Sequence, residues 1–212
     1  FIFMEEKNAK LFVNSPNAID GNRVEKCDTS SAAFQSEETG LVDFTGSEED
    51  ILSQIRSLVT ILPANNEDDM SYSECTDDLN RVCSDLENYA GATDLALAQI
   101  SDDNFFLEVK KDYDKSMVTG FIRLNGTTVG CVANRTAVYA ADGVKEDEFD
   151  AVLSANGAEK AAKFVSFCDA FNIPLLTLVN VKGYKACKCT ERRIAKNAGR
   201  LTYAFANASV PK

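Results

Sequence analysis

The segment Ile173–Val179, with the sequence IPLLTLV, is an almost unbroken apolar run that constrains the fold more than any other part of the chain. A short run of this kind is typical of a strand buried on both faces of a parallel sheet. Amphipathic helical patterns lie on either side of it. We therefore expect a central strand over Leu175–Val181, flanked by helices near Asn156–Phe171 and Glu191–Ala208, and hence an α/β fold.

A β-hairpin is predicted upstream of this unit. Met117–Leu124 and Thr127–Asn134 are rich in strand-forming residues, and only Asn125 and Gly126 separate them. The Asn-Gly dipeptide favours the positive φ angles of a type I′ turn, which joins two antiparallel strands. The sequence therefore predicts two strands followed by a helix in this half of the chain.

The first third of the chain is predicted to contain a strand over Thr39–Phe44 and then a helix. Ser47 is a favourable N-cap for that helix, and Pro63 ends it. The polar segment Cys27–Glu38 is rich in Ser and Thr, so we expect a loop there.

An acidic segment that begins at residue 65 divides the chain. We interpret residues 1–64 as the end of one lobe, 65–100 as an acidic linker with connecting helices, and 101–212 as the start of a second lobe. Phe1–Met4 resembles a strand without its beginning, and a further strand is expected to begin where Val210–Lys212 ends the chain. We therefore expect an internal fragment of a longer protein.

Composition narrows the chemistry. The net charge of −11 argues against nucleic acid as the main partner, because binding to phosphates requires clustered Lys and Arg. The seven cysteines are irregularly spaced, and neither a signal peptide nor a membrane-spanning run is evident, so we expect reduced thiols and a cytoplasmic protein. The chain has no histidine, which excludes Ser-His-Asp catalysis and HExxH zinc sites within it. Backbone amides therefore become candidate catalytic groups.

Three features near the end of the chain admit both a structural and a functional interpretation. Gly183 is either a turn glycine with positive φ or a backbone donor at the carboxyl end of a parallel strand, where ligands bind in α/β sheets. The basic residues of Lys182–Arg200 either form a solvated helix face or attract an anionic ligand. Cys187 and Cys189 give only a weak zinc signal, and we expect no metal.

Several separated motifs resemble the carboxyltransferase subunits of biotin-dependent enzymes. This family includes propionyl-CoA carboxylase β subunits and the α subunits of methylmalonyl-CoA and glutaconyl-CoA decarboxylases. The motifs cover most of the chain in the family's order, and they lie at residues 1–4, 11–13, 62–66, 118–130, 161–175, 179–184 and 201–212.

The chain also departs from the family pattern in three places. Asn180–Tyr184 stands where Asp-Val-Pro-Gly-Phe is common, and Arg192 and Arg193 stand where paired glycines often occur. The polar segment around Cys27–Gln35 replaces a stretch that is usually helical. These differences leave the acyl group of the CoA substrate open.

The resemblance implies a crotonase-like (ClpP/crotonase) fold, a spiral of ββα units with two truncated lobes, the first for acyl-CoA and the second for biotin. It implies carboxyl transfer between biotin, on a biotin carboxyl carrier protein, and the α-carbon of a coenzyme A thioester. Further implied partners are other copies of the subunit and a membrane decarboxylase subunit. We expect the fragment alone to be inactive. The alternative is a non-catalytic interaction or assembly module derived from the same fold.

The resemblance also suggests roles for individual residues. The backbone N–H of Gly183 or Tyr184 would polarise the ureido carbonyl of biotin, since fixed amides stabilise developing oxyanions without a side-chain base. Lys182 and Lys185 would add positive potential, and Asn180 would orient the loop by hydrogen bonding.

Overall fold

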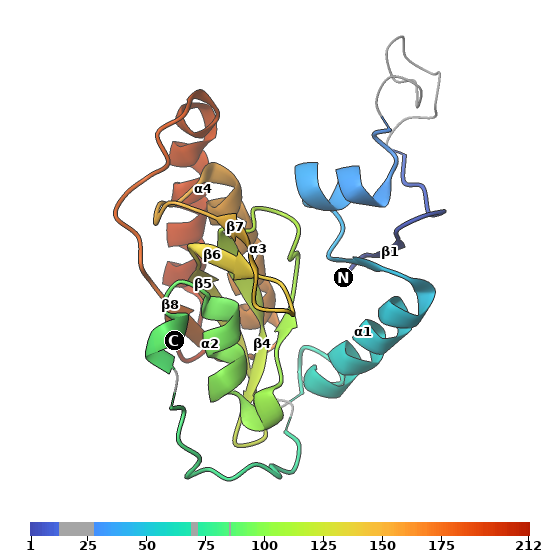
Figure 1. Ribbon diagram of the computed structural model, residues 1–212, viewed down its shortest axis with the longest axis vertical. Helices are drawn as coiled ribbons and strands as arrows, with labels where there is room; N and C mark the ends of the chain where they lie inside the picture. Colours follow the sequence, from blue (N-terminus) through green and yellow to red (C-terminus); the bar gives the residue numbers. More distant parts are fainter. Residues whose placement is uncertain (13–27, 69–71, 85) are drawn as a thin grey trace.

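A four-stranded sheet with helices on both faces forms the larger part of the structure, a computed structural model that describes residues 1–12, 28–68, 72–84 and 86–212 (Figure 1). A smaller unit of two strands and one helix lies beside this sheet. In chain order the elements are β1 (Phe3–Glu5), a π-helical turn (Phe34–Glu38), β2 (Phe44–Gly46), α1 (Glu48–Ile61), a 3-10 turn (Leu86–Tyr89), α2 (Thr93–Ile100), a 3-10 turn (Asp102–Asn104), β3 (Leu107–Glu108), β4 (Met117–Leu124), β5 (Thr127–Asn134), β6 (Ala137–Tyr139), β7 (Lys145–Glu148), α3 (Ala155–Ala170), β8 (Leu175–Leu178) and α4 (Lys188–Asn207).

The hairpin of β4 and β5 is confirmed, with its predicted turn. Leu124 pairs with Thr127, and the two turn residues have positive φ angles of 51° at Asn125 and 78° at Gly126. The buried carboxylate of Asp102 accepts hydrogen bonds from both turn amides, at 3.0 and 2.7 Å. The turn is therefore specified by its own sequence and also held by a side chain from outside the hairpin.

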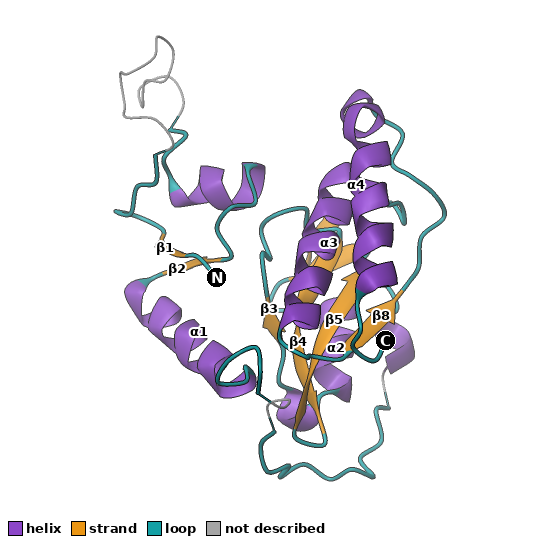
Figure 2. Ribbon diagram, turned by 180° about the vertical axis from the view of Figure 1, so that it is seen from behind, coloured by secondary structure: helices purple, strands orange, loops and turns teal. Residues whose placement is uncertain are grey.

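Helices cover the two faces of the sheet unequally. Figure 2 shows α3 and α4 side by side on one face, where Phe164 and Val165 of α3 pack against Phe121 and Leu175. On the other face, Leu97 of α2 packs against alternate residues of β4 and β5. The predicted apolar stripe of α3 is thus confirmed as its buried face, whereas in α4 Leu201 and Phe205 of the predicted stripe are partly buried against the same core.

The last strand differs from its prediction. The sheet order is β3-β4-β5-β8, so β8 is parallel to β5, as expected, but lies at the edge rather than in the centre. It is also shorter than Leu175–Val181, and Val179 is 75% exposed. The apolar run indicated a strand buried on both faces, yet the pairing of β8 with β5 ends at Leu178 and Ala133, and on its other side only the Leu175 N–H, which donates to the carbonyl of Pro211 at 2.8 Å, is bonded among the described residues.

The N-terminal unit follows the predicted order but not every predicted boundary. Strand β2 begins at Phe44, later than expected, and the segment predicted as a loop contains the π-helical turn, in which Gln35 is buried. Ser47 caps α1 as predicted, and the structure adds a reciprocal capping box with Asp50. This unit joins the main sheet through a hydrogen bond of 2.8 Å from the Thr128 hydroxyl to the carbonyl of Ile61.

No helix among the described residues has the length and apolar character needed to cross a bilayer.

Candidate functional site

A mostly apolar groove of about 410 Å³ lies where the chain leaves the sheet after β8. The start of β4 and the ends of β5 and β8 form part of its wall. The segment after β8 and the buried side of α4 complete it. The lining residues are Met117, Val132–Asn134, Leu153, Thr177–Val179, Val181–Tyr184, Leu201 and Phe205.

Asn134, at the end of β5, holds the segment that follows β8. Its amide nitrogen donates to the carbonyl of Asn180, and its amide oxygen accepts from the N–H of Asn180, both at 2.6 Å. Asn180 is therefore positioned through its backbone, by a side chain that the sequence analysis did not identify. The position of Asn134 at the last residue of a buried strand was the available signal, since polar groups there face the carboxyl edge of the sheet.

A short parallel ladder fixes the next residues. The N–H of Lys182 donates to the carbonyl of Ala151 at 2.8 Å, and the carbonyl of Gly183 accepts from Leu153 at 2.8 Å. The N–H of Lys185 then donates to the carbonyl of Leu153 at 3.0 Å. Within the described part of the chain, this ladder leaves the N–H groups of Gly183 and Tyr184 without a hydrogen-bond partner.

The structural interpretation of Gly183 is wrong, because its φ angle is not among the positive ones. A Cβ atom built on Gly183 would meet nothing within 4 Å. Neither backbone conformation nor crowding therefore requires glycine at this position. Its free amide, at the lining of the groove, is the feature that remains to be explained.

The predicted site residues do not all lie together. Lys182, Gly183 and Tyr184 line the groove, although the Tyr184 side chain is 61% exposed. Lys185 lines a different hollow of about 440 Å³. The acidic residues Asp114 and Asp147 line the same hollow. The positive potential that we expected from both lysines is thus concentrated at Lys182.

Cys187 is the N-cap of α4. Its sulfur accepts a hydrogen bond of 3.4 Å from the N–H of Thr190, and the Thr190 hydroxyl lies 3.2 Å away. These contacts hold the pKa of the Cys187 thiol below its usual value. Cys189 is exposed, and in the described ranges no three His, Cys, Asp or Glu side chains are grouped as metal ligands.

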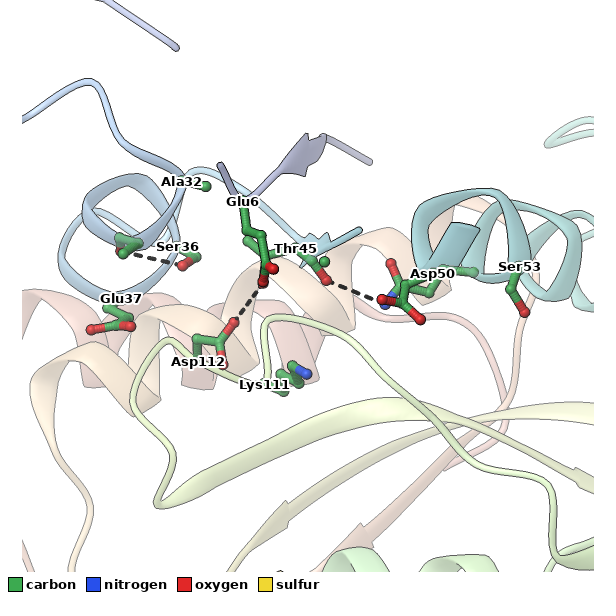
Figure 3. A pocket seen from close by; sticks show the side chains of 12 residues that line it. Glu6, Ala32, Ser36, Glu37, Thr45, Asp50, Ser53, Lys111 and Asp112 are labelled. Atoms are coloured by element: carbon green, nitrogen blue, oxygen red, sulfur yellow. Dashed lines mark hydrogen bonds between the residues drawn. The ribbon is translucent and has the colours of Figure 1, made fainter. Parts of the chain in front are cut away.

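A hollow of about 620 Å³ lies between the N-terminal unit and the loop after β3, which contributes Lys111 and Asp112 (Figure 3). Glu6, Glu37, Asp50 and Asp112 bring four carboxylates to its wall, against the single cation of Lys111. Asp50 is engaged in capping α1, and Asp112 accepts a hydrogen bond of 3.0 Å from Thr45. The negative charge of this hollow is unsuited to binding phosphate groups. We therefore place the candidate site at the groove beside Gly183.

Comparison with known proteins assigns this architecture. The model of the carboxyl transferase domain matches residues 1–212. The chain is 33% identical to the carboxyltransferase subunit of propionyl-CoA carboxylase from Haloferax mediterranei and 31% identical to the α subunit of methylmalonyl-CoA decarboxylase from Propionigenium modestum. Each comparison covers 100% of this chain and 41% of the relative, so the chain spans about two-fifths of their length.

A solved structure supports the same assignment. Transcarboxylase 12S, with methylmalonyl-coenzyme A and methylmalonic acid bound, is 31% identical with a TM-score of 0.85. The match covers 100% of this chain and 41% of that one, and the structure is described as a hexamer assembly. The present chain therefore has the crotonase-like carboxyltransferase fold.

Proposed function

Because the chain belongs to the carboxyl transferase domain family, we propose that it is part of a biotin-dependent acyl-CoA carboxyltransferase or decarboxylase subunit. The whole subunit transfers a carboxyl group between biotin and the α-carbon of an acyl-CoA thioester. The relatives named above support this proposal, as they act on propionyl-CoA or methylmalonyl-CoA. The groove described here belongs to the half of the chain that we assign to biotin, residues 101–212.

The observation that carries the proposal is the pair of unpartnered amides at Gly183 and Tyr184 beside an apolar groove. When bound, biotin supplies the ureido nitrogen that carries the carboxyl group. The two N–H groups are suited to donate to an oxygen that gains negative charge during transfer. This role needs no side-chain base, which agrees with a chain that lacks histidine.

The surroundings of the two amides favour such a role. The apolar side chains of Leu178, Leu201 and Phe205 line the groove beside them, while Gly183 and Tyr184 themselves are exposed. Asn134 fixes the backbone at Asn180, so little reorganisation is needed during the reaction. Lys182 places a positive charge at the rim.

We infer that the partners are a biotin carboxyl carrier protein and other copies of the subunit, with a membrane decarboxylase subunit if the reaction runs towards decarboxylation. The six described cysteines are free thiols, which supports a cytoplasmic location. The acyl-CoA thioester is assigned to the first lobe, to which residues 1–64 contribute.

The proposal is tested with the full-length subunit. We expect turnover of free biotin with at least one ester from a panel of acyl-CoA and malonyl-type CoA esters. Gly183→Pro, which removes the N–H, should lower kcat about a hundredfold or more, as loss of an oxyanion donor does. Gly183→Ala is the matched control and should retain activity, because its Cβ meets open space. No turnover with any ester would refute the function, and an active, folded Gly183→Pro would refute the site.

A further inference from the structure

A hollow of about 300 Å³ lies between the N-terminal unit and helix α3. Phe1 and Leu41 line it from the N-terminal unit, and Phe164 and Phe167 line it from α3. These side chains are apolar, and an apolar cavity of about 150 Å³ is enough to hold a molecule of benzene. The hollow is therefore large enough for a small organic molecule with a ring or a short apolar chain.

Three lysines also line this hollow, and two of them have a carboxylate partner. Lys110 forms an ion pair of 2.8 Å with Asp43, and Lys163 forms one of 3.0 Å with Glu159. Lys160 forms no ion pair with any residue that the structure describes. The wall of the hollow therefore contains one lysine without a carboxylate at ion-pair distance.

The ammonium of Lys160 also has an unused donor. Lys160 is 1% exposed, and its ammonium donates to the carbonyls of Tyr113 and Met117 at 2.9 and 2.6 Å. Because an ammonium has three N–H groups, one of them lacks an acceptor within the described ranges of the chain. A buried charge is costly unless an opposite charge and hydrogen bonds satisfy it. An anion in the hollow would provide both.

The charged groups around Lys160 do not compensate for its burial. Burial lowers the pKa of the Lys160 ammonium to about 7. Glu108 and Asp114 favour the charged form, whereas Arg135 and Lys110 oppose it, and burial is the largest of these effects. A negative charge beside the ammonium would raise this pKa, so an anion should bind together with a proton above pH 7.

The lining of the hollow indicates the class of ligand. One lysine without a partner matches a single negative charge, and the apolar walls match an apolar remainder. A phosphate ester carries about two charges near neutral pH, so part of its charge would stay unpaired beside apolar walls. The hollows of about 620 and 440 Å³ are lined mainly by acidic residues and are unsuited to any anion.

We propose that the hollow beside Lys160 binds a small monocarboxylic acid with an aromatic ring or a short apolar chain, and that the carboxylate of this ligand pairs with Lys160. The hollow shares no lining residue with the groove beside Gly183. The proposed site is therefore separate from that groove and does not depend on the function proposed for it.

The experiment compares phenylacetate with 2-phenylethanol, which has a similar size and the same ring but no carboxylate. Isothermal titration calorimetry with the full-length subunit should give a Kd below about 1 mM for phenylacetate. The Kd for 2-phenylethanol should be roughly tenfold higher or more, because it lacks the charge that pairs with Lys160. At pH 8, titrations in buffers with different enthalpies of ionisation should show that phenylacetate binds with uptake of up to about one proton. Equal affinity for the two compounds, or no binding of phenylacetate, would refute the proposal.

Three variants locate the binding site. Lys160→Met should raise the Kd for phenylacetate roughly tenfold or more and abolish proton uptake. Leu41→Trp adds bulk at a wall residue that is 42% exposed, so it should fold normally and raise this Kd by filling the hollow. Lys111→Met is the matched control, because Lys111 is exposed and does not line the hollow, and it should change the Kd less than about twofold. Circular dichroism and thermal unfolding verify that all three variants fold.

Coenzyme A tests whether the hollow is separate from a site for acyl-CoA. A saturating concentration of coenzyme A should leave the Kd for phenylacetate unchanged. Displacement of phenylacetate by coenzyme A, an equal loss of affinity in Lys111→Met and Lys160→Met, or unchanged affinity in Leu41→Trp would each overturn the proposed site.

Discussion

The hairpin and helix α3 differ sharply from the segment that joins β8 to α4. Phe121, Ile122 and Val165 are fully buried, and β4, which carries the first two, pairs with β5 along its whole length. The joining segment exposes Val179 by 75% and Tyr184 by 61%, and side-chain and backbone hydrogen bonds to only a few residues hold it. One region is specified by burial and the other by a small set of polar contacts.

The two regions differ in whether their backbone N–H groups are available to bind a ligand. In the hairpin, all eight residues of β4 pair with those of β5, so strand pairing occupies the backbone groups between the two strands. Beyond β8 the chain follows a path held by a few hydrogen bonds, and among the described residues the N–H groups of Gly183, Tyr184 and Ala186 are left without a partner. The stable region therefore supports the site without forming the reactive part of it.

The largest effect is expected from Phe121→Ala in the buried region. Phe121 is fully buried and packs against the rings of Phe164 and Phe167. Truncation should lower the free energy of unfolding by about 3–5 kcal/mol through lost burial and a cavity. Val179→Ala, in the joining segment, should change it by less than about 0.5 kcal/mol. Chemical denaturation measures the free energy of unfolding of both variants. Equal decreases would contradict the claim that the hairpin region is specified by burial and the joining segment is not.

Lys160 provides a second test within the buried region. It is 1% exposed, and its ammonium donates to the carbonyls of Tyr113 and Met117 at 2.9 and 2.6 Å. Burial lowers its pKa to about 7 in the folded protein, while the unfolded value stays near 10.5. Above pH 7 the unfolded chain binds the extra proton, so stability from this residue should rise with pH.

Lys160→Met isolates that contribution. Between pH 7 and 9 the stability of the wild type relative to the variant should rise, by up to about 1.4 kcal/mol per pH unit for one proton. Other groups, such as the Cys131 thiol, whose pKa burial raises to about 12, contribute equally to both proteins and cancel. Urea denaturation at each pH measures the difference. A difference that is constant with pH would show that Lys160 stays charged in the folded protein.

Asn134 connects the two regions and should have a smaller effect on stability but a larger one on activity. Asn134→Ala removes two hydrogen bonds, at a cost of about 0.5–1.5 kcal/mol each. Asn134→Asp keeps the acceptor for the Asn180 N–H and should lose less. In the full-length subunit, kcat with free biotin should fall more for Ala than for Asp. If stability falls while kcat is unchanged, the path of the joining segment does not matter for turnover.

Sequence patterns predicted the regions unequally, for physical reasons. The hairpin, the cap at Ser47 and the stripe of α3 depend on neighbouring residues, so they were predicted correctly, and the resemblance to the carboxyltransferase family was confirmed. The edge position of β8 depends on which strands lie beside it, and an apolar run does not encode that. The same holds for Asn134, which is 46 residues from Asn180 in sequence.

The central claim is that the backbone N–H of Gly183 donates to the oxygen that gains charge during carboxyl transfer. Replacing the Gly183 amide with an ester in the full-length subunit removes the donor and leaves the chain otherwise unaltered. An ester at Ala186, whose N–H also lacks a partner among the described residues, is the matched control. The ester at Gly183 should lower kcat with free biotin by about a hundred- to a thousandfold, while the ester at Ala186 leaves it unchanged. Equal turnover for the two folded esters would contradict the claim.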